Sequence, residues 1–120
     1  MSNFVDFESK TANPENKGVF DISPEELMQK KGSVTMIDVR REDEYTGELG
    51  HIPGAKHLLL DQLPMRINEV SKEHTTVFVC RSGARSGRAT NFAMERGYTS
   101  VYNLKGGMIL WNEKNLPIEK

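Results

Sequence analysis

The sequence has little of several features that mark particular classes of protein. It contains a single cysteine among 120 residues, which excludes an intrachain disulfide and a cysteine-rich metal site. Its formal net charge is −1, so its overall charge does not favour nucleic acid or a membrane surface as a partner. No apolar run approaches the length of a membrane span, and residues 1–10 lack the apolar core of a signal peptide. We therefore expect a soluble protein in the reducing cytoplasm.

Metal and dithiol chemistry also lack their usual signatures. No two histidines have the spacing of a local metal site, so we expect neither a metal nor another cofactor. There is no C-x-x-C pair, which disfavours a dithiol oxidoreductase. The chain shows no repeat, linker or low-complexity segment, and its length fits one domain. We place that domain at residues 18–120, after a polar segment at residues 1–17 in which we expect no regular element.

The most informative stretch of the sequence surrounds the cysteine. A short apolar run at residues 77–79 is typical of a buried strand, and it ends at Cys80. Residues 86–96 suit a helix, with Gly97 as its C-terminal cap. A tight loop therefore joins the end of a strand to the start of a helix, which is the ligand-binding edge of an open α/β sheet. The residues of this loop are Arg81, Ser82, Gly83, Ala84, Arg85 and Ser86.

Such a loop favours a reactive thiolate. Successive backbone N–H groups and the positive end of the helix dipole converge on its centre, and Gly83 permits a backbone conformation that other residues resist. A thiol held there loses its proton easily and can attack an anionic or electrophilic substrate. The alternative is an inert cysteine that acts as a small apolar residue. Three arginines, two glycines and two serines within the next eight residues argue against that alternative.

The rest of the chain alternates strands with helices, which predicts a largely parallel sheet with helices on both faces. Ser23 and Pro24 begin the first helix, and we expect Glu26 to complete a capping box with Ser23. The strand before this helix is expected at an edge of the sheet. We expect strands at residues 18–22, 34–39, 55–60, 75–79 and 100–104. We expect helical segments at residues 23–32, 41–45, 63–70, 86–96 and 108–112, the last of which packs Trp111.

Three stretches together resemble the rhodanese-like domain family. The first runs from Ile37-Asp38-Val39-Arg40 through Glu44-Tyr45 to Gly50-His51-Ile52-Pro53-Gly54-Ala55. The second is the loop from Cys80 to Ser86. The third is Tyr102-Asn103-Leu104-Lys105-Gly106-Gly107 with Trp111. The resemblance covers about residues 18–115, and three signatures in this order are highly specific.

The resemblance implies a five-stranded, mostly parallel sheet and a sulfurtransferase activity. Cys80 would accept a sulfane sulfur from an anionic donor such as thiosulfate, or from a persulfide, and pass it to a thiol or to cyanide. The loop amides would stabilise the resulting persulfide, while Arg81 and Arg85 would hold the donor. Asp38 and Arg40 would brace the loop, unless Asp38 merely ends a strand and Arg40 is a solvated surface charge. The resemblance gives the segment around His51 a role in shaping the fold.

Other functions stay open at this point. A sulfur carrier that serves a specific partner protein would use the same Cys80 persulfide. A regulatory module is a further alternative, although the presence of Cys80 with its arginines argues against a non-catalytic domain. A cysteine phosphatase or arsenate reductase would need an arginine six residues after the cysteine, in a C-x5-R loop. Residue 86 is serine and Arg85 falls one position short, which makes the loop better suited to a sulfur atom than to a tetrahedral phosphate.

Overall fold

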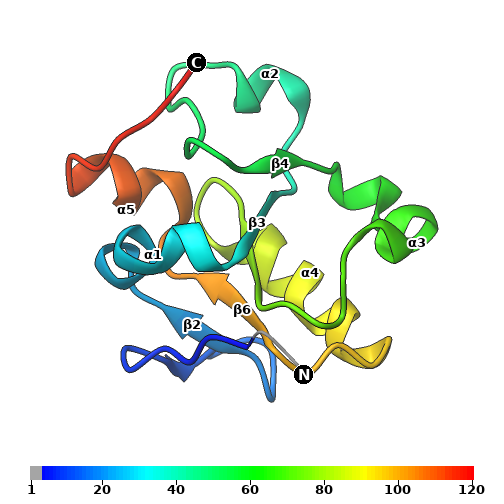
Figure 1. Ribbon diagram of the computed structural model, residues 1–120. Coiled ribbons are helices and arrows are strands. Elements are labelled where there is room, and N and C mark those ends of the chain that lie inside the picture. Colours follow the sequence, from blue (N-terminus) through cyan, green and yellow to red (C-terminus); the bar gives the residue numbers. More distant parts are fainter. Residues whose placement is uncertain (1–3) are drawn as a thin grey trace.

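The computed structural model describes residues 4–120, which form a six-stranded sheet flanked by helices (Figure 1). The strand order is β1-β2-β6-β5-β3-β4; β1 pairs antiparallel with β2, and all other pairs are parallel. The strands are β1 (Thr11–Ala12), β2 (Phe20–Ile22), β3 (Thr35–Asp38), β4 (Lys56–His57), β5 (Thr76–Val79) and β6 (Val101–Leu104). The α/β class and the mostly parallel sheet predicted from the sequence are confirmed.

The number of strands and the position of β2 differ from the prediction. The sixth strand is β1, in a segment where no regular element was expected. It is two residues long and is stabilised by its pairing with β2. In this pairing Thr11 lies opposite Asp21, and Ala12 lies opposite Phe20. The pairing places β1 at the edge, so β2 is not the edge strand that its sequence suggested. The division into residues 1–17 and 18–120 stays a prediction.

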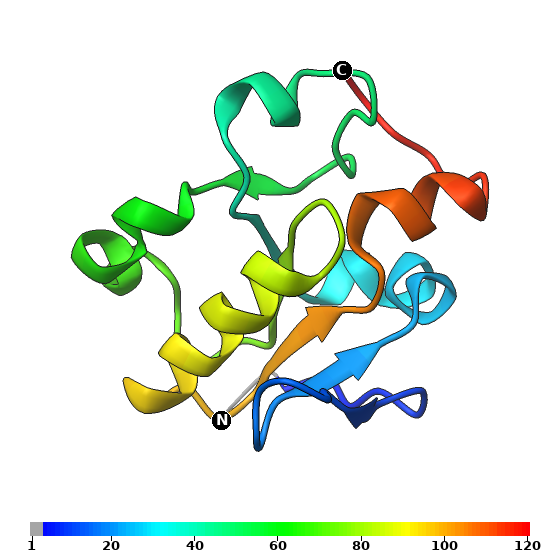
Figure 2. The ribbon, with the colours of Figure 1, turned by 180° about the vertical axis from the view of Figure 1, so that it is seen from behind.

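The helices lie on both faces of the sheet. They are α1 (Pro24–Lys30), α2 (Glu42–Tyr45), α3 (Leu63–Arg66), α4 (Ala84–Glu95) and α5 (Gly107–Glu113). In Figure 1, α1 crosses in front of the sheet, with α5 near it; Figure 2 shows α4 in front of the opposite face. The predicted helix from residue 63 consists of α3 followed by a 3-10 turn at Ile67–Glu69.

The start of α1 is capped by Ser23 but not by the expected capping box. The Ser23 side chain accepts a hydrogen bond from the Glu26 backbone N–H. The Glu26 carboxylate turns away and accepts from the backbone N–H groups of Glu8 and Ser9 at 2.9 and 2.8 Å. The N-terminal segment folds over α1 and supplies these donors, and two backbone donors outcompete the single one that a capping box offers.

Two apolar clusters form the core, one on each face of the sheet. The first includes Phe78, Ala89 and Ala93, where α3 and α4 cover β3, β5 and β6. The second contains Phe7 of the N-terminal segment, Leu27 of α1 and Trp111 of α5, and each of these side chains is fully buried. The predicted packing of Trp111 is therefore confirmed. The two clusters hold the sheet rigid, which fixes the ends of β3, β5 and β6 relative to one another.

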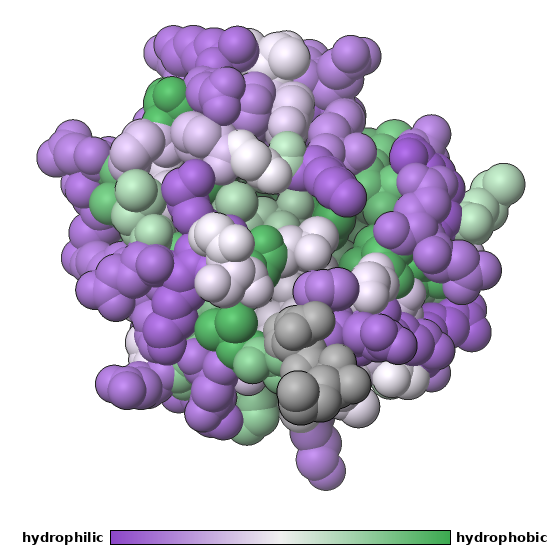
Figure 3. All heavy atoms as spheres, viewed as in Figure 1, coloured by the Kyte–Doolittle hydropathy of each residue, from purple (hydrophilic) through white to green (hydrophobic). Residues whose placement is uncertain are grey.

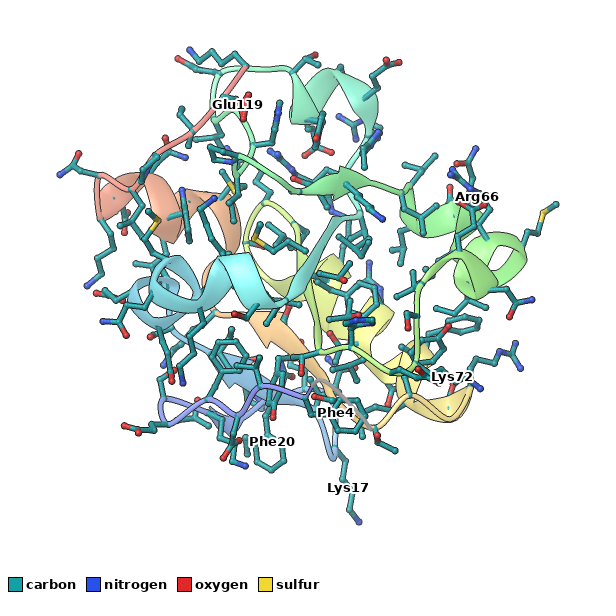
Figure 4. The ribbon with its side chains drawn as sticks, viewed as in Figure 1. Phe4, Lys17, Phe20, Arg66, Lys72 and Glu119 are labelled. Atoms are coloured by element: carbon teal, nitrogen blue, oxygen red, sulfur yellow. The ribbon has the colours of Figure 1, made fainter. Side chains whose placement is uncertain are left out.

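The surface is mostly hydrophilic on the face seen in Figure 3, with apolar residues in scattered spots. Phe4 and Phe20 are 46% and 41% exposed and lie along the lower part of Figure 4. The C-terminal end of the chain is held by an isolated antiparallel bridge between Glu119 and His51. Within residues 4–120, none of the helices is both long and apolar enough to cross a membrane.

Candidate active site

The single cysteine lies where β5 ends, at the base of a tight loop. We call residues 80–86 the Cys80 loop; it forms the arch between β5 and α4 in Figure 2. Cys80 is 1% exposed, and its Sγ accepts a hydrogen bond from the Gly83 N–H at 3.0 Å. Gly83 has φ of +103°, a left-handed conformation that turns its N–H toward the sulfur. The loop thus directs a backbone donor at the sulfur, as the sequence suggested.

The start of α5 supports the loop from its outer side. The Met108 and Ile109 N–H groups donate to the carbonyl oxygens of Cys80 and Arg81 at 2.9 and 3.0 Å. These contacts need close approach, since a Cβ on Gly107 would lie 2.5 Å from the Cys80 carbonyl oxygen. The backbone of the Cys80 loop is therefore fixed by a helix N-terminus that is distant in sequence.

A chain of polar side chains reaches the sulfur from the β2 side. The Ser86 hydroxyl lies 3.2 Å from Cys80 Sγ and also contacts Asn103 Oδ1. Asn103 Nδ2 donates to Asp21 Oδ1 at 2.9 Å and to the Gly83 carbonyl at 3.1 Å. Both amide hydrogens are thereby used, so Oδ1 must face Ser86. Asn13 Nδ2 donates to the same Asp21 oxygen at 2.9 Å.

Asp38 and Arg40 form a buried, two-pronged ion pair after β3. Arg40 Nε and Nη2 donate to the two Asp38 carboxylate oxygens at 2.9 and 2.8 Å, and the side chains are 1% and 0% exposed. Arg40 Nη2 also donates to the Gly50 carbonyl at 2.7 Å. Arg40 is therefore not a solvated surface charge. The pair ties the end of β3 to the loop that follows α2, and its role in catalysis stays a prediction.

Arg85, at the start of α4, is held by Glu44 of α2. Its Nη1 and Nη2 donate to the two Glu44 carboxylate oxygens at 2.7 and 2.8 Å. The Glu44 side chain is 15% exposed and that of Arg85 is 27% exposed. The hydrogen bonds from Arg85 lower the pKa of Glu44 to about 2, and those same bonds raise the pKa of Arg85. This half-buried pair joins α2 to the Cys80 loop.

The lowered pKa makes the contribution of Glu44 to stability depend on pH. Since the pKa is about 2 in the folded protein and 4.5 for an ordinary glutamate, as in the unfolded chain, the contribution is complete above about pH 4.5 and is lost as the pH falls toward 2. We expect Glu44→Gln to lower the free energy of unfolding by about 1–3 kcal/mol at pH 7 and by much less at pH 2.5. Urea unfolding at a series of pH values measures this difference.

Glu48→Gln is the matched control for that experiment. Glu48 lies near Glu44, is exposed, and has no ion pair within residues 4–120. Its variant should follow the pH dependence of the parent protein. A difference between parent and Glu44→Gln that stays constant from pH 7 to pH 2.5 would contradict the proposed linkage.

Two cavities border the Cys80 loop. The smaller, about 160 Å³, is lined by Arg81 and by residues around α2, and we call it the Arg81 cavity. Its lining residues are Arg40, Asp43, Glu44, Gly47, Glu48, Leu49 and Arg81. The larger, about 560 Å³, is lined by Ser82, Gly83 and Ala84 on one side and includes residues 11–16 in its lining. Arg81, Ser82 and Ala84 are exposed, and Arg81 forms no ion pair within the described part of the chain.

The histidines near the site contact other parts of the structure. His51 stacks on Tyr45 with ring centroids 3.8 Å apart, and its Nδ1 donates to the Tyr45 carbonyl at 2.8 Å. His57 also stacks on Tyr45 and donates to the Arg40 carbonyl. Among residues 4–120 there is no cluster of three or more histidine, cysteine or acidic side chains that could bind a metal ion.

Sequence reasoning missed three residues of this site. Glu44 and Asn103 lie within the quoted signatures but had no assigned role, and Asp21 had no signal at all. Their partners are 41 residues (Glu44 to Arg85) and 82 residues (Asp21 to Asn103) away in the chain. The one general clue was the topology, since the carboxyl ends of parallel strands meet at one edge of the sheet.

Comparison with known proteins identifies the class of protein. Residues 23–114 match the Rhodanese-like domain. A sulfurtransferase of Allochromatium vinosum is 39% identical over 103 residues, which cover 83% of this chain and 94% of that protein. The thiosulfate sulfurtransferase GlpE of Actinobacillus pleuropneumoniae is 32% identical over 102 residues, which cover 82% of this chain and 92% of that protein.

Solved structures agree with the sequence relatives. The crystal structure of a rhodanese-like domain protein from Staphylococcus aureus has a TM-score of 0.71 and 30% identity; the similarity covers 83% of this chain and 98% of that chain. The chain belongs to the rhodanese-like domain family. The relatives named above support sulfur transfer as its general class of activity.

Proposed function

We propose that the protein is a sulfurtransferase that carries sulfur as a persulfide on Cys80. The observation that carries the proposal is the environment of Cys80 Sγ, which accepts from the Gly83 N–H and contacts the Ser86 hydroxyl at the start of α4. The Gly83 N–H is a fixed donor for a sulfur anion, and the single hydroxyl hydrogen of Ser86 is within reach of Cys80 Sγ and of Asn103 Oδ1. A thiolate or a persulfide anion is the species that such a site stabilises.

The proposed reaction has two displacement steps. The Cys80 thiolate attacks the outer sulfur of thiosulfate, the sulfur–sulfur bond of the donor breaks, and sulfite leaves with the bonding electrons. With a persulfide donor, a thiolate leaves instead. In the second step cyanide or a thiolate attacks the outer sulfur of the Cys80 persulfide, which forms thiocyanate or a new persulfide and restores the Cys80 thiolate. Two half-reactions of this kind give ping-pong kinetics.

The parts of the Cys80 loop have separate roles in this proposal. The Gly83 N–H stabilises the sulfur anion, and Asn103 holds the Ser86 hydroxyl beside it. Arg81 is exposed and attracts anionic donors. Ser82, Ala84 and Arg85 complete the loop, and the buried Asp38–Arg40 pair fixes the segment opposite it.

A phosphatase or arsenate reductase is not supported by the geometry. Those reactions need an arginine that binds phosphoryl or arsenate oxygens through both terminal nitrogens. Arg85 is one position early for such a loop, and both of its terminal nitrogens donate to Glu44.

Intact mass spectrometry tests the proposed function. We expect the protein to gain the mass of one sulfur atom after incubation with thiosulfate or with glutathione persulfide, and to lose it on addition of cyanide or a reductant. The Cys80→Ser variant should gain nothing. If neither donor adds a sulfur atom to the parent protein, or if Cys80→Ser still acquires one, the proposal is wrong.

A further inference from the structure

Arg85 is the loop arginine nearest in sequence to the helix start, and its charge is neutralised within the protein. Both of its terminal nitrogens donate to Glu44, at 2.7 and 2.8 Å. A two-pronged pair of this kind is among the strongest that arginine makes, and half burial reduces its screening by solvent. Arg85 is thus not free to bind the oxygens of a donor unless Glu44 gives it up.

The Arg81 cavity supplies no net positive charge beside the loop. Its lining contains three carboxylates, Asp43, Glu44 and Glu48, and two arginines, Arg40 and Arg81. Arg40 is already paired with Asp38, within the protein interior. Asp43 is paired with Arg41 and Glu44 with Arg85, so within residues 4–120 the unpaired charges of the lining are one carboxylate, Glu48, and one guanidinium, Arg81. A dianionic donor that reaches the Cys80 loop from this cavity therefore meets no net positive charge that would attract it.

We propose that Glu44 is a specificity-determining residue that selects against dianionic sulfur donors by neutralising Arg85. This inference rests on the proposed function and names its donor class. The donors favoured are persulfides, in which the sulfane sulfur is attached to a thiol and the leaving group is a thiolate. Thiosulfate, which carries two negative charges and whose leaving group is a sulfite dianion, is disfavoured.

The chemistry is the same for both donor classes, so Glu44 acts on binding. In the favoured case the Cys80 thiolate attacks the outer sulfur of a persulfide R–S–SH, the sulfur–sulfur bond breaks, and R–S⁻ leaves with the bonding electrons. No oxidant or reductant is needed. The persulfide proton stays on the sulfur that is transferred or passes to solvent.

The test compares two donors with the parent protein and Glu44→Gln. The donors are thiosulfate and the persulfide of 2-mercaptoethanol, whose hydroxyethyl group carries no charge. Cyanide is the acceptor for both. The parent should have a higher kcat/KM for the persulfide. Glu44→Gln releases Arg85, so we expect its kcat/KM for thiosulfate to rise about tenfold, mainly through a lower KM. Its kcat/KM for the persulfide should change by less than about twofold.

Two further variants separate the release of Arg85 from a general change in charge. Glu48→Gln removes the same charge from the Arg81 cavity but leaves the Glu44–Arg85 pair intact, so its donor preference should shift by no more than about twofold. In a double-mutant cycle, Glu44→Gln should have no effect on thiosulfate when Arg85 is already alanine.

The outcomes distinguish this inference from the proposed function. If the parent takes sulfur from both donors but Glu44→Gln leaves their ratio unchanged, the inference is wrong and the function stands. If Glu48→Gln shifts the ratio as much as Glu44→Gln, the effect belongs to the general field of the cavity and the inference is also wrong. If the parent takes sulfur from neither donor, the proposed function itself fails.

Discussion

Replacement of Cys80 by serine is expected to reduce sulfur transfer by at least about a thousandfold, because the reaction passes through a covalent bond to this sulfur. A serine hydroxyl is not ionised near neutral pH and forms no stable bond to a sulfane sulfur. Thiocyanate formation from cyanide, measured with thiosulfate and with a persulfide donor, gives the loss of kcat/KM.

The fold should tolerate this change. A serine hydroxyl at position 80 can accept the hydrogen bond that Gly83 N–H now donates to Sγ, so we expect the free energy of unfolding to change by less than about 1 kcal/mol. Met65→Ala is a suitable control, since Met65 is a sulfur-containing side chain that is 88% exposed. It should retain full activity. Turnover by a folded Cys80→Ser protein would show that another nucleophile carries the sulfur.

The parts of the site that were predictable from sequence are those with local causes. The position of Cys80 at a strand end followed from the apolar run before it, and the left-handed turn at Gly83 followed from the glycine itself. The rest of the strand and helix pattern followed from hydrophobic periodicity. The observed helix α4 begins at Ala84, two residues earlier than the expected start, which is the usual uncertainty at a helix end.

The parts that sequence did not predict depend on tertiary contacts. Strand β1 has no local signal, because two residues form a strand only when a partner strand is present. Glu26 accepts from Glu8 and Ser9 because the N-terminal segment returns over α1. Arg85 pairs with Glu44 of α2, a contact that no local pattern indicates, and its role in holding a donor stays a prediction. Each difference arises where a distant segment offers a better partner than the neighbouring residues do.

The ion pair between Asp38 and Arg40 joins residues two positions apart but is fully buried, and its loss should have the largest effect on stability. We expect Arg40→Met to lower the free energy of unfolding by about 3–5 kcal/mol, since it leaves the Asp38 carboxylate buried without its partner. Asp38 is 0% exposed, so water cannot replace the two hydrogen bonds that Arg40 donates. Chemical denaturation near neutral pH measures the loss.

A double variant separates the cost of the unpaired charge from the loss of packing. Asp38→Asn combined with Arg40→Met removes both charges. In the parent protein the backbone N–H of residue 40 donates to Asp38 Oδ1 at 3.1 Å, and the asparagine side chain keeps an oxygen that can accept this hydrogen bond. Since uncharged replacements of buried pairs are often close to neutral, the double variant should regain at least about half of the stability lost by Arg40→Met. A double variant that is as unstable as Arg40→Met would mean that the loss comes from the Arg40 contact with the Gly50 carbonyl, and that the ion pair does not hold the segment after α2 in place.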